Sequence, residues 1–373
     1  MLSRRSLLVT GLAGGLTGCA SRTKNAYVGF AFVATRDSGD IAIVDLAAFS
    51  LEKKRIKPSG RPVQLIDVPG QDFLLSVSDN GAVEEVSVTE TSITRKLKSP
   101  LAPESVWLNH DATTIWGLSP DHKTLLAVDR ATFNTRAQWT LPARARTIAV
   151  SPGSPHVAVS FEGANDIGIL RDSSEKEFLI SKIDQTPGQL RYLKNGSMLI
   201  VTHDQERQLT MVDSASGKIV VALPLPIRPE NLCFNSDGGQ LFITGEGLDG
   251  VVVVYPYQSQ VAATLLSGKS PGPMAVSRQP QYLFVTSPST DTVSVLDVRT
   301  QKLAAVIAVG NNPRCIVFTP DSQMALVLNQ RSGDMAIIRL GNIVSKRQKT
   351  APLFTMIPVG SAPVAAVVRS VSV

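Results

Sequence analysis

Five arginines of this 373-residue chain recur at related places in the sequence and carry its best candidate chemistry. They are Arg61, Arg144, Arg146, Arg228 and Arg314, and each stands directly before or after a recurring Pro or Ala. A guanidinium donates two coplanar hydrogen bonds, which suits carboxylate and phosphate groups. We therefore interpret them as a candidate anion site, opposed by Glu104 and Glu230.

The recurring Pro or Ala positions, called marks here, define a repeat of about 42 residues. Successive marks are 41, 42, 42, 42, 42, 42 and 50 residues apart, at Pro62, Pro103, Ala145, Pro187, Pro229, Pro271, Pro313 and Pro363. A period this regular indicates one supersecondary unit that is copied many times.

Each repeat contains about four short runs with strand character. The runs at 281–287 and 292–297 are rich in β-branched and aliphatic residues, and Ser, Pro, Thr and Asp separate them. Such runs predict antiparallel strands joined by turns. Four strands in about 42 residues are typical of a β-propeller blade.

The two ends of the chain predict how the ring closes. In the first repeat, 19–25 contains no strand where the innermost one is due, whereas the last mark, Pro363, opens a strand and the chain ends ten residues later. We expect this C-terminal strand to pair with strands from residues 27–57, which removes the exposed edges between the first and last blades. The prediction is a single all-β propeller over 26–373, with eight blades favoured and seven as the alternative.

In the predicted propeller, the five arginines flank the upper mouth of the channel, where the innermost strands begin. Arg61, Arg144 and Arg228 each stand one residue before a mark. Two interpretations stay open. The arginines bind an anionic ligand, or they pair with acidic loops such as 204–206 and hold neighbouring blades together.

Other chemical groups give weaker signals. His122 and His203 fall in predicted upper-face loops, where either is a candidate axial ligand or general base. The aspartates at the ends of several third strands recur in register, which favours turn capping over chemistry: Asp45, Asp129, Asp213 and Asp297. No Cys/His cluster has metal-ligand spacing, so no metal site is predicted, and no catalytic residue is assigned.

The N-terminal segment predicts export and lipid anchoring. Arg4 and Arg5 precede a short apolar, Gly-rich stretch, and Leu16-Thr-Gly-Cys19 follows. The paired arginines resemble a twin-arginine export signal, and the second motif resembles a bacterial lipobox with Cys19 as the lipidated residue. We predict a signal peptide over 1–18, a tether over 19–25, and a protein attached to the lipid bilayer of the cell envelope, facing the periplasm or the exterior.

The remaining cysteines and the charge exclude other classes of protein. Cys233 and Cys315 lie on innermost strands two blades apart, which is too far for a disulfide. The net charge is +6, and the loss of Arg4 and Arg5 lowers it by two. Because the basic residues are scattered without aromatic partners, no nucleic-acid partner is expected.

Several strand pairs resemble the Tyr-Val-Thr-Asn type of bacterial β-propeller repeat, which is found in exported and surface proteins. These are Leu283-Phe-Val-Thr-Ser287 with Val293-Ser-Val-Leu-Asp297, Leu241-Phe-Ile-Thr244, and Leu199-Ile-Val-Thr-His203. The resemblance is informative about the architecture of the chain but says little about its activity, because propellers carry many unrelated functions.

Two functions stay open at this stage. The leading hypothesis is a non-enzymatic, membrane-tethered scaffold that binds a protein partner or a small anionic ligand on its upper face. The alternative is an enzymatic or cofactor-handling propeller, similar to lactonase-like propellers or to the eight-bladed propellers that bind heme d1 or assist its biosynthesis. No motif identifies an axial histidine, and heme d1 enters only through this alternative.

Overall fold

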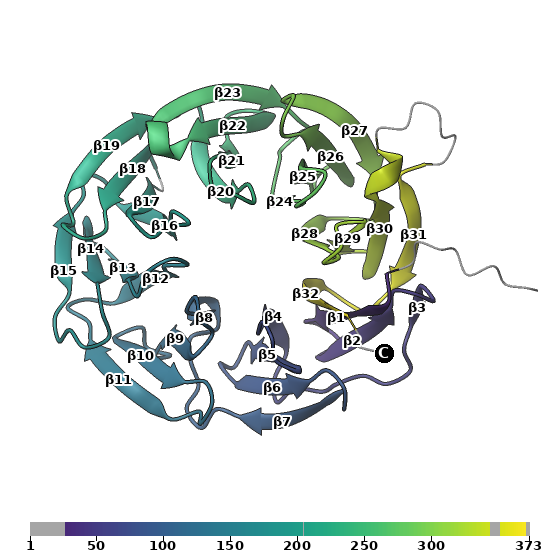
Figure 1. Ribbon diagram of the computed structural model, residues 1–373, viewed down its shortest axis with the longest axis horizontal. Helices are drawn as coiled ribbons and strands as arrows, with labels where there is room; N and C mark the ends of the chain where they lie inside the picture. Colours follow the sequence, from purple (N-terminus) through teal and green to yellow (C-terminus); the bar gives the residue numbers. More distant parts are fainter. Residues whose placement is uncertain (1–26, 204, 344–350, 371–373) are drawn as a thin grey trace, which may run out of the picture.

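The chain folds into a ring of eight sheets around a central channel (Figure 1). This computed structural model describes residues 27–203, 205–343 and 351–370. Each sheet has four antiparallel strands, so the predicted eight-bladed β-propeller is confirmed and the seven-bladed alternative is wrong. Blade 1 consists of β32, β1, β2 and β3, and blades 2 to 8 follow in chain order from β4–β7 to β28–β31. The predicted leader, the tether and Cys19 lie outside the described residues.

The strands take four successive positions from the channel outward. The innermost strands are β4 (Pro62–Asp67), β8 (Trp107–Leu108), β12 (Ala145–Val150), β16 (Pro187–Tyr192), β20 (Arg228–Phe234), β24 (Met274–Val276), β28 (Pro313–Phe318) and β32 (Pro363–Ser370). The second strands are β1 (Gly29–Thr35), β5 (Phe73–Ser78), β9 (Thr114–Leu118), β13 (Val157–Phe161), β17 (Met198–His203), β21 (Leu241–Glu246), β25 (Tyr282–Ser287) and β29 (Met324–Asn329).

The third and fourth strands complete each blade toward the rim. The third strands are β2 (Asp40–Asp45), β6 (Val83–Ser87), β10 (Thr124–Asp129), β14 (Asp166–Leu170), β18 (Gln208–Asp213), β22 (Gly250–Tyr255), β26 (Thr292–Asp297) and β30 (Asp334–Arg339). The fourth strands are β3 (Ser50–Leu51), β7 (Ser92–Lys96), β11 (Thr135–Thr140), β15 (Leu179–Lys182), β19 (Ile219–Pro224), β23 (Gln260–Leu266), β27 (Lys302–Ala308) and β31 (Leu353–Pro358).

Helical structure among the described residues is limited to three single 3₁₀ turns: η1 (Pro103–Ser105), η2 (Pro256–Gln258) and η3 (Leu340–Asn342). Within these ranges, no helix is long and apolar enough to cross a membrane. The core lies between the blades, where Val, Ile, Leu and Ala side chains from neighbouring blades pack together. Burial of one such large side chain contributes about 1.5–3 kcal/mol, so these layers provide the main driving force for folding.

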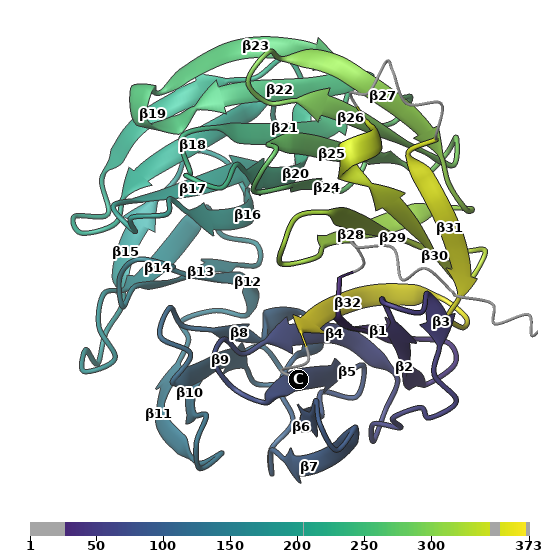
Figure 2. The ribbon, with the colours of Figure 1, turned by 45° about the vertical axis from the view of Figure 1, so that its right-hand side comes forward.

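The ring closes through the C-terminal strand, as predicted. β32 pairs antiparallel with β1, with Phe32 opposite Val367 and Ala31 opposite Val368. Figure 2 shows β32 beside β1, although more than 300 residues separate them in the chain. Chain closure therefore depends on one long-range strand pairing, and blade 1 is built from both ends of the chain.

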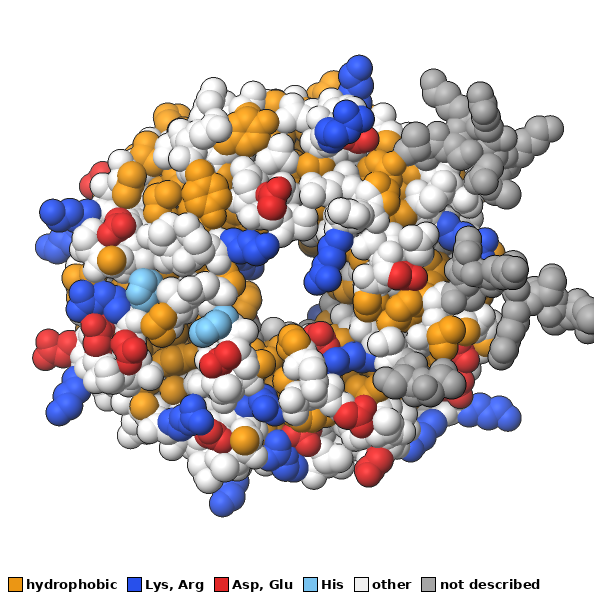
Figure 3. All heavy atoms as spheres, in the orientation of Figure 1, with side chains coloured by type: hydrophobic (Ala, Val, Ile, Leu, Met, Phe, Trp, Pro, Cys, Tyr) orange, Lys and Arg blue, Asp and Glu red, His pale blue; other side chains and the backbone are white. Residues whose placement is uncertain are grey.

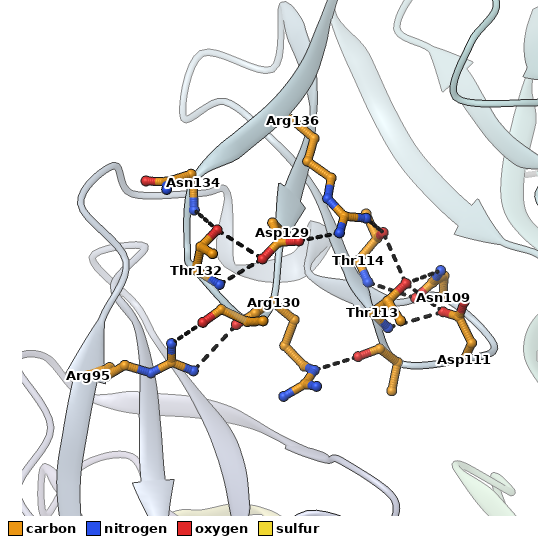
Figure 4. Close-up of polar contacts among 12 residues, drawn as sticks. Arg95, Asn109, Asp111, Thr113, Thr114, Asp129, Arg130, Thr132, Asn134 and Arg136 are labelled. Atoms are coloured by element: carbon orange, nitrogen blue, oxygen red, sulfur yellow. Dashed lines mark hydrogen bonds and ion pairs between the residues drawn. The ribbon is translucent and has the colours of Figure 1, made fainter.

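The recurrent aspartates cap turns on the lower face, as expected. Asp129 accepts hydrogen bonds from the backbone N and the hydroxyl of Thr132, at 2.7 and 2.8 Å (Figure 4). Asp45, Asp213 and Asp297 accept from the backbone N of the residue three positions later in the same way. Each closes the turn between a third and a fourth strand.

Candidate functional site

Two adjoining hollows lie at the upper mouth, where the innermost strands begin. A pocket of about 640 Å³, here called the upper pocket, lies across blades 6, 7 and 8. An adjoining pocket of about 490 Å³ lies across blades 4, 5 and 6, and the two share Glu230 and Glu246. Together they cover five consecutive blades of the mouth.

A β-bulge positions the residue that follows each of several marks. In β12, β20 and β28 the strand register shifts between the mark and the second residue after it, so that the intervening residue has no partner on the second strand. These unpaired residues are Arg146, Glu230 and Arg314. A bulge turns a side chain out of the regular alternation, and all three line the two pockets.

The residues before the marks have a different role. Arg61 pairs with Asp79 at 2.7 Å, Arg144 with Glu162 at 3.3 Å, and Arg228 with Glu246 at 2.6 Å. The Arg61 guanidinium holds the pKa of the Asp79 carboxyl below its ordinary value by donating a hydrogen bond. Each acid stands 18 residues after its arginine and lies at the end of the second strand of the same blade or directly after it.

A neutral pair occupies this position in blade 8. There the side-chain amide of Asn312 donates to the Gln330 side chain at 3.3 Å, again across 18 residues. The pair at this position thus links the start of the first strand to the end of the second strand of the same blade, and we call it the clasp pair. This supports the interpretation of these arginines as structural, although the acids belong to the arginine's own blade rather than to the 204–206 loop.

Two arginines on blade 8 form no ion pair with a described residue, although hydrogen bonds from Asn312 and Asn311 and the nearby charge of Arg331 lower the pKa of Asp291. Arg314 donates from Nε to the Asn312 side chain at 3.3 Å and forms no ion pair. Arg331 comes from the loop between β29 and β30, and it lines the same pocket. Arg146, in the adjoining pocket, donates to the Pro187 carbonyl at 3.4 Å.

The opposite wall of the upper pocket is acidic. Glu230, Glu246 and Asp249 line it from blade 6, while Ser270, Pro271 and Gly272 of blade 7 form an uncharged section between the two walls. Glu246 is engaged with Arg228, and Asp249 accepts from the backbone N of Ser270 at 2.8 Å. The pocket therefore presents cations on one side and hydrogen-bond acceptors on the other.

The structure places both candidate histidines outside the two pockets. His122 lies in an upper-face turn, with Nδ1 3.1 Å from the Ala145 carbonyl and Nε2 3.1 Å from a Glu104 oxygen. His203 is buried at the end of β17, with Nε2 2.7 Å from the Thr210 hydroxyl. Their described contacts hold one turn and one strand pair in place.

No metal site and no disulfide are seen in the part of the chain that the structure describes. No group of three or more His, Cys, Asp or Glu side chains is arranged there to hold a metal ion. Cys233 and Cys315 are free, as their two-blade separation predicts. Of the five predicted arginines, Arg146 and Arg228 line the adjoining pocket and Arg314 lines the upper pocket. Arg61 and Arg144 line neither of the two.

Sequence reasoning missed Arg331 and Asp249, because both come from loops between second and third strands. The marks identify only residues at the starts of the innermost strands. The same 42-residue period places those loops on the upper face as well, and Arg331 directly follows Gln330 of the clasp pair. The signal was therefore present, at a second position of the repeat.

No protein-family model matches the sequence, and no curated protein matches it. Among solved structures the chain is similar to dihydro-heme d1 dehydrogenase NirN in complex with DHE, with a TM-score of 0.74, 12% identity, and coverage of 94% of this chain and 78% of that one. It is also similar to hydrazine synthase of Kuenenia stuttgartiensis, with a TM-score of 0.58, 17% identity, and coverage of 74% and 95%.

A third similar structure is the β-propeller domain of Cps50 (Swd1) from Myceliophteria thermophila, with a TM-score of 0.58, 13% identity, and coverage of 75% and 96%. Identities this low show the fold alone. The resemblance to the Tyr-Val-Thr-Asn repeat stays a prediction. What the comparisons support is an eight-bladed β-propeller similar in architecture to NirN.

Proposed function

We propose that this protein is a non-enzymatic binding propeller that holds a small anionic ligand in the upper pocket. The observation that carries the proposal is the pair Arg314 and Arg331, which line a 640 Å³ hollow and form no ion pair with a described residue. An anionic group of the ligand would accept hydrogen bonds from these guanidiniums. The acidic wall across the pocket favours a ligand that also carries hydrogen-bond donors.

The test uses citrate and inorganic phosphate as probes in isothermal titration calorimetry. We expect saturable binding of at least one probe, and an affinity at least tenfold lower in the Arg314→Gln/Arg331→Gln double variant. The matched control is Arg299→Gln/Lys302→Gln, which removes two exposed charges far from the mouth. Equal binding by both double variants, or no saturable binding of either probe, would contradict the proposal.

A cofactor-handling propeller is the second candidate, favoured by the NirN-like architecture. The lining of the two pockets fits this only in part. Arginines there suit the carboxylates of a tetrapyrrole, but no His, Cys or Met lines either pocket, so no customary iron ligand is present. We therefore derive no chemistry through a haem. A visible absorption band in protein purified from its native host would support this candidate, and a colourless protein would count against it.

Export and lipid anchoring at Cys19 complete the proposal and place the propeller in the cell envelope. The support is the sequence of the leader alone. In cell fractionation we expect the wild-type protein with the membranes and Cys19→Ala in the soluble envelope fraction. An unchanged distribution of Cys19→Ala would contradict lipidation. Chemical cross-linking of the same cells tests for a protein partner on the upper face.

A further inference from the structure

One residue breaks the pattern of an otherwise apolar ring inside the propeller. The fourth residue after each mark lies at an equivalent place on each innermost strand, and we call these eight residues the inner ring. They are Ile66, Trp107, Ala149, Arg191, Cys233, Ala275, Val317 and Val367. Seven are uncharged, and Arg191 is the single cation.

Arg191 has no carboxylate partner among the described residues. Its guanidinium carbon lies 5.3 Å from the centre of the Trp107 ring, and its Nη1 donates to the Leu190 carbonyl at 3.1 Å. Trp107 belongs to blade 3 and Arg191 to blade 5. The intervening inner-ring residue is the small Ala149, which leaves room for the contact.

The half-buried guanidinium has no counter-charge among the described residues. The surrounding blades desolvate Arg191 and lower its pKa from the ordinary value, and no anionic group of the described residues opposes this effect. A buried charge is costly unless a counter-charge or strong hydrogen bonds offset the desolvation. The tryptophan ring offsets only part of it, because a cation–π contact contributes about 0.5–2 kcal/mol.

Elsewhere on the innermost strands the fold does supply a carboxylate. Arg369 of β32 is also half-buried, yet it pairs with Asp67 at 2.7 Å and donates to the carbonyls of Val68 and Phe73. The lack of a partner at Arg191 is therefore a local property of the sequence. The ring geometry does not require it.

The lower mouth carries charges of both signs. Lys194 and Arg278 lie in turns between first and second strands, and Figure 3 shows Lys and Arg side chains beside the central opening. Acids lie in turns of the same kind, where Asp111 accepts from Thr113, Asp237 from Gly239 and Asp321 from Gln323. The attraction for an anion inside the channel therefore comes from Arg191 itself and not from the lower mouth.

We propose that Arg191, with Trp107 beside it, binds a small monovalent anion inside the channel, either chloride or a carboxylate group. The guanidinium donates to the anion, and the indole ring holds the guanidinium in place. This site is independent of the proposed upper-pocket function. Its occupant is a free ion or the carboxylate of a larger ligand that enters from the mouth.

The experiment follows tryptophan emission and thermal unfolding while chloride or formate replaces methanesulfonate at constant ionic strength. We expect a saturable change in both readouts for the wild-type protein. Arg191→Gln should bind at least tenfold more weakly, whereas Arg299→Gln, which removes an exposed arginine, should bind like wild type. A Trp107→Phe variant should lose most of the emission change and keep the thermal shift.

The outcomes separate the sources of the anion and decide the proposal. Saturation by chloride or formate indicates a free ion. If only acetate and longer carboxylates saturate, and Arg314→Gln/Arg331→Gln lowers their affinity as well, the anion is part of a ligand that reaches the channel from the mouth. The same response in Arg191→Gln as in the wild type, or no saturable response to any of these anions, would overturn the site. Far-ultraviolet circular dichroism confirms that each variant is folded.

Discussion

At the upper mouth, three arginines pair with carboxylates of their own blades, whereas in the inner ring Arg191 contacts a tryptophan ring and a carbonyl and has no carboxylate partner in the described part of the chain. The mouth is open to water, so its ion pairs contribute little to stability. The inner ring is enclosed by eight blades, and there a missing partner matters more. Arginine thus links two strands of a blade at the upper mouth, and it is a candidate ligand-binding group in the inner ring.

The largest expected effect concerns thiol reactivity, because Cys233 and Cys315 are shielded from water whereas the upper mouth is open to it. Burial raises the pKa of Cys233, in the inner ring, to about 12 and that of Cys315 to about 11. Because the thiolate is the nucleophile, we expect both to react with iodoacetamide at pH 8 more than about a hundredfold slower than an exposed thiol. Mass spectrometry of the Cys19→Ala chain measures the rates, with the unfolded protein as control. Fast labelling of Cys233 would show that water reaches the inner ring freely.

A methyl group added at Gly245 tests how tightly the backbone is packed at the upper mouth. A Cβ at Gly245 would lie 1.8 Å from the Arg228 carbonyl oxygen and 2.9 Å from the Glu230 nitrogen. We expect Gly245→Ala to lower the free energy of unfolding by roughly 3 kcal/mol and to weaken citrate binding in the upper pocket. Guanidinium unfolding measures the first effect. Gly341→Ala is the control, since its Cβ would meet nothing within 4 Å, and equal effects of the two changes would refute the argument.

Replacing arginine by methionine should change stability with opposite signs in the two regions. In methanesulfonate buffer we expect Arg191→Met to raise the free energy of unfolding by about 1 kcal/mol, because it removes an uncompensated charge from an apolar ring. Arg228→Met should lower it by less than about 1 kcal/mol through loss of the Glu246 pair. Thermal unfolding measures both. Destabilisation by Arg191→Met would mean that the Trp107 contact outweighs the desolvation.

The smallest effect concerns pH and the lower face. Burial lowers the pKa of His156, which packs near Tyr192 at a ring-centroid distance of 6.3 Å. The unfolded state therefore binds the proton more readily, and stability falls as the pH drops below about 6.5. One such proton changes the free energy of unfolding by at most about 1.4 kcal/mol per pH unit. His156→Gln should flatten the stability profile between pH 7 and 5, and an unchanged slope would assign the pH dependence to other groups.

The fold was predictable in detail because the sequence contains eight copies of one repeat unit. Each copy needs the same turn residues and the same alternation, so the period located the strands, and the incomplete first and last copies indicated the closure of β1 with β32. The capping role of Asp129 and its equivalents followed for the same reason, since a group that recurs in register serves the repeat.

The candidate site was predictable only in its location. The period identified Arg146, Arg228 and Arg314 as mouth residues, but it did not distinguish the clasp position before a mark from the bulge position after it. That distinction depends on Asp79, Glu162 and Glu246 and on the register shift in each innermost strand. None of these partners is adjacent to the arginines in the sequence.

The sequence by itself determined the architecture, the blade number and the face on which the arginines gather, because these properties depend on local strand patterns repeated at fixed spacing. The tertiary structure decided which charges are neutralised. Arg228 has an acid across its own blade, while Arg314, Arg331 and Arg191 form no ion pair with a described residue. Ion pairing depends on distances of a few ångströms between segments far apart in the chain, and only the folded ring sets those distances.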